Sequence, residues 1–172
     1  HAPRIAALFP GCVPAPDQLA SSLNNPNPIA HVPAYLLNAT RAQDEAAGRV
    51  APGGAFHLSD AGSPELESLR SRMDSERMEV MNAIGMGHRA LSRGDFGALA
   101  YGPGSREDAP PRIGPTFQRR FVREEVPFGL VPLETLARGA GLRVPVISAV
   151  IETVCAMTGD DLRSSAPDAS DL

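Results

Sequence analysis

Proline and glycine divide much of this chain into four segments that have the pattern of α-helices. A proline stands at the start of each segment, and the apolar run that follows closes at or near a glycine. Proline fits the first turn of a helix because its φ is already helical and its missing N–H would have had no partner there. Glycine is the usual residue just beyond a helix end. The segments predicted to be helical are 28–48, 64–85, 132–141 and 145–159.

Two of these segments also predict how the helices pack. In 64–85 the apolar residues recur at helical spacing, with arginines and acids between them, so one face should lie on a core. These apolar residues are Leu66, Leu69, Met73, Val80 and Ile84. Segment 145–159 is apolar on nearly every side, which predicts a helix deep in the core or in a subunit interface. Pro33, inside the first segment, should kink that helix.

Signals for β-strands are few. Only residues 4–11, RIAALFPG, resemble a short strand, because the rest of the chain lacks alternation of apolar and polar residues. Stretches 51–63 and 101–115 are rich in turn-forming residues and should be loops. We therefore predict an all-α domain over residues 23–163, preceded by a short strand-like N-terminal lead-in and followed by a flexible polar tail at 164–172.

The charge distribution argues against nucleic acid as a partner. The net charge is −4, and the arginines are scattered among acids instead of forming a basic stripe. No apolar run is long enough to cross a bilayer, so no membrane partner is expected. The two cysteines, Cys12 and Cys155, fit no metal-binding spacing. So few thiols are typical of an intracellular protein, and we expect cytoplasmic location and no metal.

A first candidate site lies in segment 28–48. His31, Tyr35 and Asn38 are spaced i, i+4 and i+7 and so share one helical face. These three residues form a polar stripe on a helix whose other residues, such as Leu36, are typical of a core. Imidazole changes its charge near neutral pH, which suits it to donate and accept protons. The stripe indicates either a catalytic site or a buried histidine with a satisfied hydrogen bond.

A second candidate site lies at residues 119–132, RRFVREEVPFGLVP, where charges meet prolines and a glycine. We expect VPFGLVP to form a rigid corner that fixes Arg120 and Glu125. A guanidinium can hold a carboxylate through two parallel hydrogen bonds, and a carboxylate can orient an imidazole. The alternative is a solvated ion pair in which Arg120 binds Glu124.

Other motifs in the chain point away from common types of site. Residues 85–90, GMGHRA, match a dinucleotide-binding pattern but follow a predicted helix, so Gly85 should simply end that helix. His57 and His88 have no carboxylate or cysteine neighbours at ligand spacing, which argues against zinc. The chain contains no lysine. That excludes a lysine Schiff base and counts against the Lys-centred site expected of a dehydrogenase resembling ketopantoate reductase.

Taken together, these stretches resemble the C-terminal α-helical domain of the octopine/nopaline dehydrogenases, the opine dehydrogenase family. The resemblance spans residues 5–163, and the matching pieces occur in family order. They are LFPG, LNNPNPIAHVPAYLLNA, SERMEVMNAIG with Glu76 and Arg77, and RFVREEVPFGLVPLETLARGAGLRVPVISAVIE. The resemblance implies an enzyme that reduces the imine formed between an amino acid and a 2-oxo acid such as pyruvate. It also implies NAD(H) or NADP(H), bound mainly by an N-terminal Rossmann domain.

The resemblance further implies roles for individual residues. The family's catalytic His would be His31, and its substrate-binding Arg would be Arg120. The Asp that pairs with the catalytic His would be at position 125, where this chain has Glu. Asn38 and Tyr35 would line the same pocket.

The expected partners follow from the same resemblance. Residues 1–22 look like the end of a Rossmann domain, so the chain alone should bind no dinucleotide tightly. We expect this domain, the two substrates and a second copy in a homodimer as partners. The alternative is a non-catalytic helical dimerisation or ligand-sensing module, which the Glu at position 125 would favour.

Overall fold

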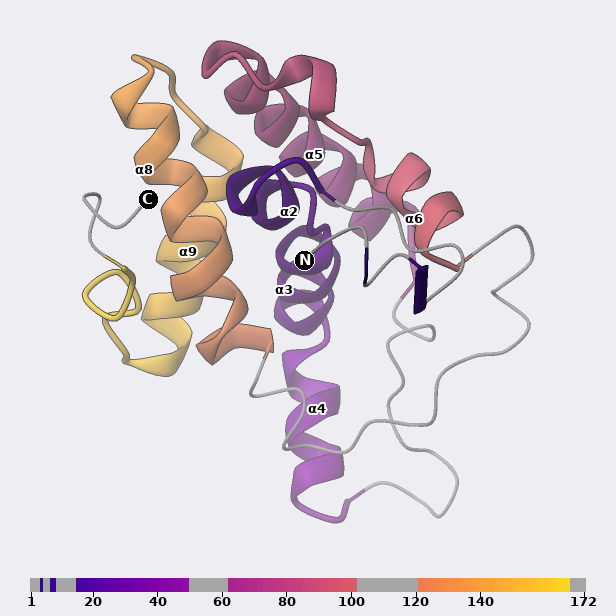
Figure 1. Cartoon of the computed structure of the whole chain (residues 1–172). Coiled ribbons are helices and arrows are strands. Elements are labelled where there is room, and N and C mark those ends of the chain that lie inside the picture. The colour runs from indigo at the N-terminus through magenta and orange to yellow at the C-terminus, as the bar shows by residue number, and fades with distance from the viewer. Residues whose placement is uncertain (1–3, 5–6, 9–14, 50–61, 102–120, 168–172) are drawn as a thin grey trace.

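The computed structural model describes residues 4, 7–8, 15–49, 62–101 and 121–167 (Figure 1). Every regular element within these ranges is a helix, which confirms the predicted all-α fold. The elements in chain order are α2 (Gln18–Leu23), α3 (Asn27–Leu37), α4 (Ala39–Ala46), α5 (Pro64–Ala83), the 3₁₀ turn η2 (Gly87–Arg89), α6 (Arg93–Tyr101), the π-helical turn η3 (Val126–Leu130), α8 (Val131–Gly139) and α9 (Pro145–Thr158).

The local signals in the sequence set the ends of the two longest helices as predicted. At the start of α5 the Ser63 hydroxyl accepts a hydrogen bond from the Leu66 N–H at 3.2 Å. Beyond the C-terminal end of α5, Gly85 has a φ of +79°. Gly159, with a φ of +72°, ends α9 in the same way. Glycine adopts this left-handed conformation without steric cost, which is why it stops a helix so often.

Two expectations for the N-terminal half are wrong. Arg4, Ala7 and Leu8 are the described part of the strand-like lead-in, and they are helical. Alanine and leucine are strong helix formers, so helix is the locally favoured state there. The single helix expected over 28–48 is two helices, α3 and α4, because the helical run is interrupted at Asn38. Pro33 lies inside α3.

The rigid corner expected at VPFGLVP is also wrong, because this stretch continues a helical run. Residues 126–130 form the π-helical turn η3, which leads directly into α8. Pro127 and Pro132 lack the N–H that a regular α-helix needs, and their rings crowd the carbonyl four residues earlier. A wider turn relieves that crowding, and such π turns inside helices often occur at functional sites.

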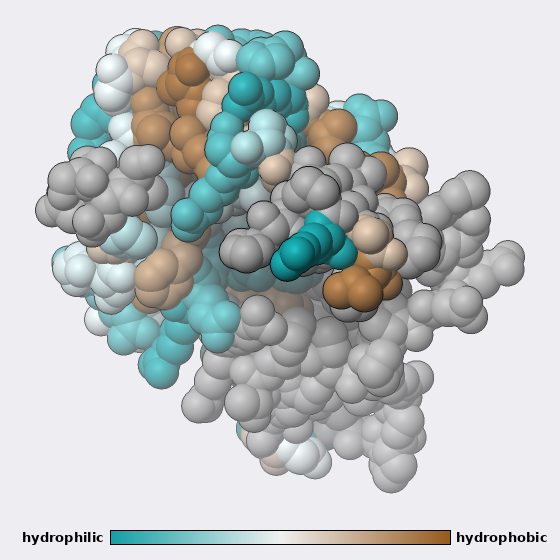
Figure 2. All heavy atoms as spheres, in the orientation of Figure 1, coloured by the Kyte–Doolittle hydropathy of each residue, from teal (hydrophilic) through white to brown (hydrophobic). Residues whose placement is uncertain are grey.

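The core forms where α3, α5, η3, α8 and α9 meet. α3 packs against α5, η3 and α9, and Figure 1 shows it between α8 and α5. The largest fully buried side chains come from α3, α5, η3 and α9, among them Ile29, Met73, Met81, Leu130 and Ile151. α8 adds the buried side chains of Leu133 and Ala137. Figure 2 shows apolar surface gathered over the C-terminal half of α8.

α9 packs on the core with one face, although its sequence is apolar on nearly every side. The buried face is made by Ile147, Val150, Ile151 and Val154. The opposite face, which includes Met157, is exposed. The expected burial of α9 therefore holds for one side, and a subunit interface on the other side stays a prediction.

Buried charges on α5 tie its neighbours together. The Glu76 carboxylate accepts hydrogen bonds from the backbone N–H groups of Val146 and Ile147, both at 2.9 Å, and so caps the N-terminus of α9. The Arg77 guanidinium is 2% exposed and donates to the carbonyls of Leu23 and Leu91. The Glu-Arg pair noted in the sequence therefore organises the fold around α5.

Candidate functional site

His31 and Glu125 are in contact, although they lie 94 residues apart in the sequence. The distance from His31 Nδ1 to Glu125 Oε1 is 3.1 Å. Both side chains are mostly buried, with exposed fractions of 14% and 12%. His31 lies in the middle of α3, and Glu125 is the residue just before η3. The spatial relationship expected of the candidate site is therefore present.

The close approach of α3 and η3 depends on Gly129. A Cβ atom added to Gly129 would lie 2.3 Å from Pro28 Cγ and 2.9 Å from Pro28 Cβ. Pro28 belongs to the first turn of α3, three residues before His31. Any side chain at position 129 would therefore push α3 away from the helical run that carries Glu125.

Phe121 is a third residue of this site, next to His31 and Glu125. No motif in the sequence points to it. Its ring centroid lies 4.3 Å from that of His31, with an angle of 36° between the ring planes. Phe121 is 2% exposed. The i, i+4 spacing of Phe121 and Glu125 was the available signal, since it places both side chains on one face of a helix.

Arg70 holds the backbone next to His31. It lies on α5 and donates from Nε and Nη2 to the Ala30 carbonyl, at 3.0 and 2.6 Å. Its guanidinium also binds Glu67, which in turn binds Arg93. Burial alone would raise the pKa of the Glu67 carboxyl, but the hydrogen bonds and positive charges of Arg70 and Arg93 outweigh it and lower the pKa. This charged network anchors the peptide that precedes His31.

The other predicted site residues have varied outcomes. Arg120 lies outside the described residues. The Asn38 side-chain amide donates to the Ala34 carbonyl at 2.9 Å, so it supports the end of α3. Tyr35 is half-buried against the core and lines a cavity of about 40 Å³ together with side chains from α4 and α9. The structure therefore brings His31 and Glu125 together and leaves the roles of the other three as predictions.

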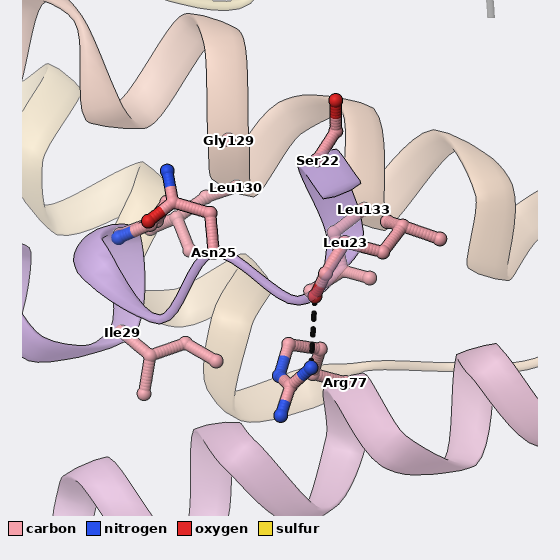
Figure 3. A pocket seen from close by; sticks show the side chains of 9 residues that line it. Ser22, Leu23, Asn25, Ile29, Arg77, Gly129, Leu130 and Leu133 are labelled. Atoms are coloured by element: carbon pink, nitrogen blue, oxygen red, sulfur yellow. Dashed lines mark hydrogen bonds between the residues drawn. The ribbon is translucent and has the colours of Figure 1, made fainter. Parts of the chain in front are cut away.

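A small cavity near the start of α3 is shown in Figure 3. Pro28, Ile29, Gly129 and Arg77 are among its lining residues, and its volume is about 20 Å³. That volume holds one water molecule, whereas substrate pockets usually measure hundreds of Å³. Arg77 in this cavity is already bound to the Leu23 carbonyl, the dashed line in Figure 3. We therefore interpret this cavity as a small gap in the packing of the core, and not as a substrate pocket.

The His31–Glu125 contact defines what the imidazole can do. An ionised carboxylate only accepts hydrogen bonds, so the proton of the neutral imidazole is expected on Nδ1. Nε2 is then the ring nitrogen that can exchange a proton with another molecule. Within the part of the chain that the structure describes, Nε2 makes no hydrogen bond. This is the arrangement of a general acid–base whose orientation a carboxylate controls.

The described residues do not supply a dinucleotide-binding unit. Such a unit needs a strand, a glycine-rich turn and a helix. In the described ranges there is no strand, and residues 85–90 form the turn that follows α5, including η2. Nor is any described helix long and apolar enough to cross a membrane.

Comparison with known proteins agrees with the resemblance in sequence. Residues 14–158 match the family described as NAD/NADP octopine/nopaline dehydrogenase, alpha-helical domain. The chain is 28% identical to the opine dehydrogenase of Arthrobacter sp. (strain 1C), over 93% of this chain and 45% of that protein. It thus spans less than half the length of this curated relative. The chain belongs to the α-helical domain family of the NAD/NADP octopine/nopaline dehydrogenases.

Proposed function

We propose that this chain carries the proton-transferring and substrate-binding side chains of an NAD(P)H-dependent opine dehydrogenase. The reaction would be the reductive condensation of an amino acid with a 2-oxo acid such as pyruvate. The observation that supports this most directly is the buried His31–Glu125 contact in a member of the octopine/nopaline dehydrogenase family.

His31 is assigned the proton transfer. Forming the imine requires protons to be added to and removed from a carbinolamine, and the amine product also exchanges a proton. A histidine held at Nδ1 can perform both steps through Nε2, because it donates when protonated and accepts when neutral. Its side chain is 14% exposed, so the imidazole is not sealed off from solvent.

Glu125 is assigned the orientation of His31. A carboxylate oxygen 3.1 Å from Nδ1 accepts the Nδ1–H of the neutral ring and so fixes the tautomer. The family resemblance implies Asp at this position. Glu is longer by one methylene group, and the backbone of the helical run before η3 lies at a distance that the longer side chain spans.

Arg120 is assigned the substrate carboxylate. Its guanidinium can make two parallel hydrogen bonds to a carboxylate, and such a clamp converts binding energy into alignment. Arg120 directly precedes Phe121, the residue that packs against His31. Asn38 and Tyr35 are assigned to the lining of the same pocket, as the resemblance implies.

The hydride is proposed to come from NADH or NADPH bound by a Rossmann domain outside these 172 residues. The nicotinamide supplies the reducing chemistry, while this chain holds the substrates and manages protons. The support for this division is the 45% coverage of the opine dehydrogenase from Arthrobacter sp. (strain 1C).

The test uses the full-length gene product. Oxidation of NADH and of NADPH is followed with pyruvate and a panel of amino acids, and the product is identified by mass as the secondary-amine dicarboxylate. His31→Ala should lower kcat by about 10²- to 10⁴-fold, the usual contribution of a general acid–base. An H31A variant that stays within a few-fold of wild type contradicts the assignment of His31. A wild-type protein that oxidises neither cofactor supports the non-catalytic module instead.

A further inference from the structure

We propose that Phe121 is a positioning residue that fixes the plane of the His31 imidazole. The proposal rests on the proposed function, because it concerns how the proton-transferring ring is aimed. No role for Phe121 follows from the motifs in the sequence, and the contact with His31 is what singles it out.

The hydrogen bond to Glu125 does not by itself fix the plane of the ring. It restrains Nδ1, but the ring plane can still tilt through small coupled rotations about the Cα–Cβ and Cβ–Cγ bonds. A flat side chain against the ring face removes that tilt. Phe121 is in this position, with its centroid 4.3 Å from that of His31 and its plane tilted by 36°, a common geometry for aromatic pairs.

Phe121 is well placed to act as a fixed reference. It is 2% exposed, and its neighbours Val122 and Val126 are buried in the core. It stands four residues before Glu125, so one helical face presents both the carboxylate and the ring. On the other side, Arg70 fixes the Ala30 carbonyl and with it the backbone of His31. The imidazole is thus restrained at its backbone, at Nδ1 and at its face.

A phenyl ring suits this task because it restrains without competing for the proton. It has no acidic proton and no lone pair that could bind Nδ1 or Nε2. A residue that aims the proton donor without touching substrate should affect kcat more than KM.

The kinetic test compares three variants of the full-length enzyme. Phe121→Leu keeps the site apolar but removes the flat ring, and Phe121→Tyr restores the ring. Val80→Ala is the control for loss of core packing. Val80 is fully buried on α5, ten residues from Arg70 and so about 15 Å along the helix axis. F121L should lower kcat at least 10-fold with KM within two-fold, F121Y should recover most of kcat, and V80A should keep wild-type kcat. An F121L kcat within two-fold of that of V80A overturns the proposal.

A second measurement does not depend on turnover. NMR line widths of the His31 ring signals report whether the ring plane is fixed. Wild type and F121Y should show sharp ring signals, whereas F121L should show exchange broadening. Line widths are compared instead of chemical shifts, because loss of the Phe121 ring current moves the shifts in any case. If the protein proves to have no dehydrogenase activity, this measurement still decides. Equal line widths in wild type and F121L overturn the role of Phe121, and broadening in F121L with intact folding supports it.

Discussion

Gly129 of η3 and Pro28 of α3 touch at a distance that only glycine permits. A Cβ on Gly129 would lie 2.3 Å from Pro28 Cγ, well inside van der Waals contact. Proline has no flexible end that could move aside, so the backbones of the two helical elements would have to separate. This contact therefore controls the spacing between the two parts of the chain that carry His31 and Glu125.

We expect Gly129→Ala to weaken both the fold and the site. Overpacking of a close contact costs about 1–3 kcal/mol of the free energy of unfolding. The separation of η3 from α3 should also lengthen the His31–Glu125 contact and lower kcat. Urea denaturation and steady-state kinetics measure the two effects. The matched control is Gly139→Ala, where nothing lies within 4 Å of the added Cβ. Equal stability of the two alanine variants would contradict this interpretation.

Shortening Glu125 should be nearly as harmful as neutralising it. In this backbone the carboxylate of Glu125→Asp would fall short of Nδ1 by about one C–C bond, or 1.5 Å. Glu125→Gln keeps the length, but its amide can donate to Nδ1 as well as accept from it, so it no longer holds the proton on Nδ1. We expect both variants to lower kcat by about 10-fold or more, within several-fold of each other. An E125D enzyme with wild-type kcat would show that the side-chain length is not matched to the site.

Removing Glu76 should destabilise α9 at its N-terminus. Glu76→Ala leaves the N–H groups of Val146 and Ile147 without their acceptor, at a cost of about 1–3 kcal/mol for each buried group. Glu76→Gln keeps one acceptor oxygen but loses the charge that favours a helix N-terminus, so its loss should be smaller. Urea denaturation gives both values. An E76A variant that unfolds at the same urea concentration as wild type would show that Glu76 does not stabilise α9.

The Glu134–Arg163 pair should make stability depend on pH in the acid range. Burial would raise the pKa of the Glu134 carboxyl, but hydrogen bonds from Arg163 and Ser148 and the charge of Arg163 outweigh it and lower the pKa. The unfolded chain then binds a proton at a higher pH than the folded chain does. The stabilisation is complete above the ordinary pKa of Glu, about 4.3, and is lost as pH falls through the lower folded value.

Urea denaturation from pH 7 to pH 3 measures this effect. Glu134→Gln should flatten the decline of stability with falling pH, and Glu152→Gln is the control, since its side chain is 69% exposed and it shares only Arg163. Glu67, whose pKa is also lowered, contributes in the same direction and should preserve part of the slope in E134Q. A slope in E134Q equal to that of wild type would show that this pair does not govern the acid range.

Local signals predicted the helices well where one residue type decides the conformation. The start of α5 and the glycine stops of α5 and α9 depend on neighbouring residues. Pro145 marks the start of α9, but the cap of that start comes from Glu76 on α5, which no local pattern reveals. α2 was missed although Asp17 marks its start, with its Oδ1 accepting from the Ala20 N–H at 2.7 Å. The prolines of VPFGLVP suggested a corner because the sequence does not reveal that a π turn can accommodate them.

The candidate site could be predicted only in part, because its contacts join distant segments. The pairing of residues 31 and 125 followed from family resemblance, since no local pattern links positions 94 residues apart. No motif in the sequence assigns a role to Phe121, and its ring contact with His31 is what distinguishes it. The hydrogen bond from Arg70 to the Ala30 carbonyl could not be predicted from the sequence either, because the acceptor is a backbone group.

The π turn at 126–130 has a consequence for how this region can vary. A π turn holds one residue more than an α turn, and one residue rotates a helix by about 100°. The residues before the π turn direct Glu125 toward His31 on α3. The residues after the turn direct Leu133 into the core. Deleting one residue from this turn would leave the composition almost unchanged, yet it would turn either the carboxylate or the apolar stripe to the wrong side. Apart from Gly129, whose identity the contact with Pro28 fixes, this turn should tolerate changes of residue better than changes of length.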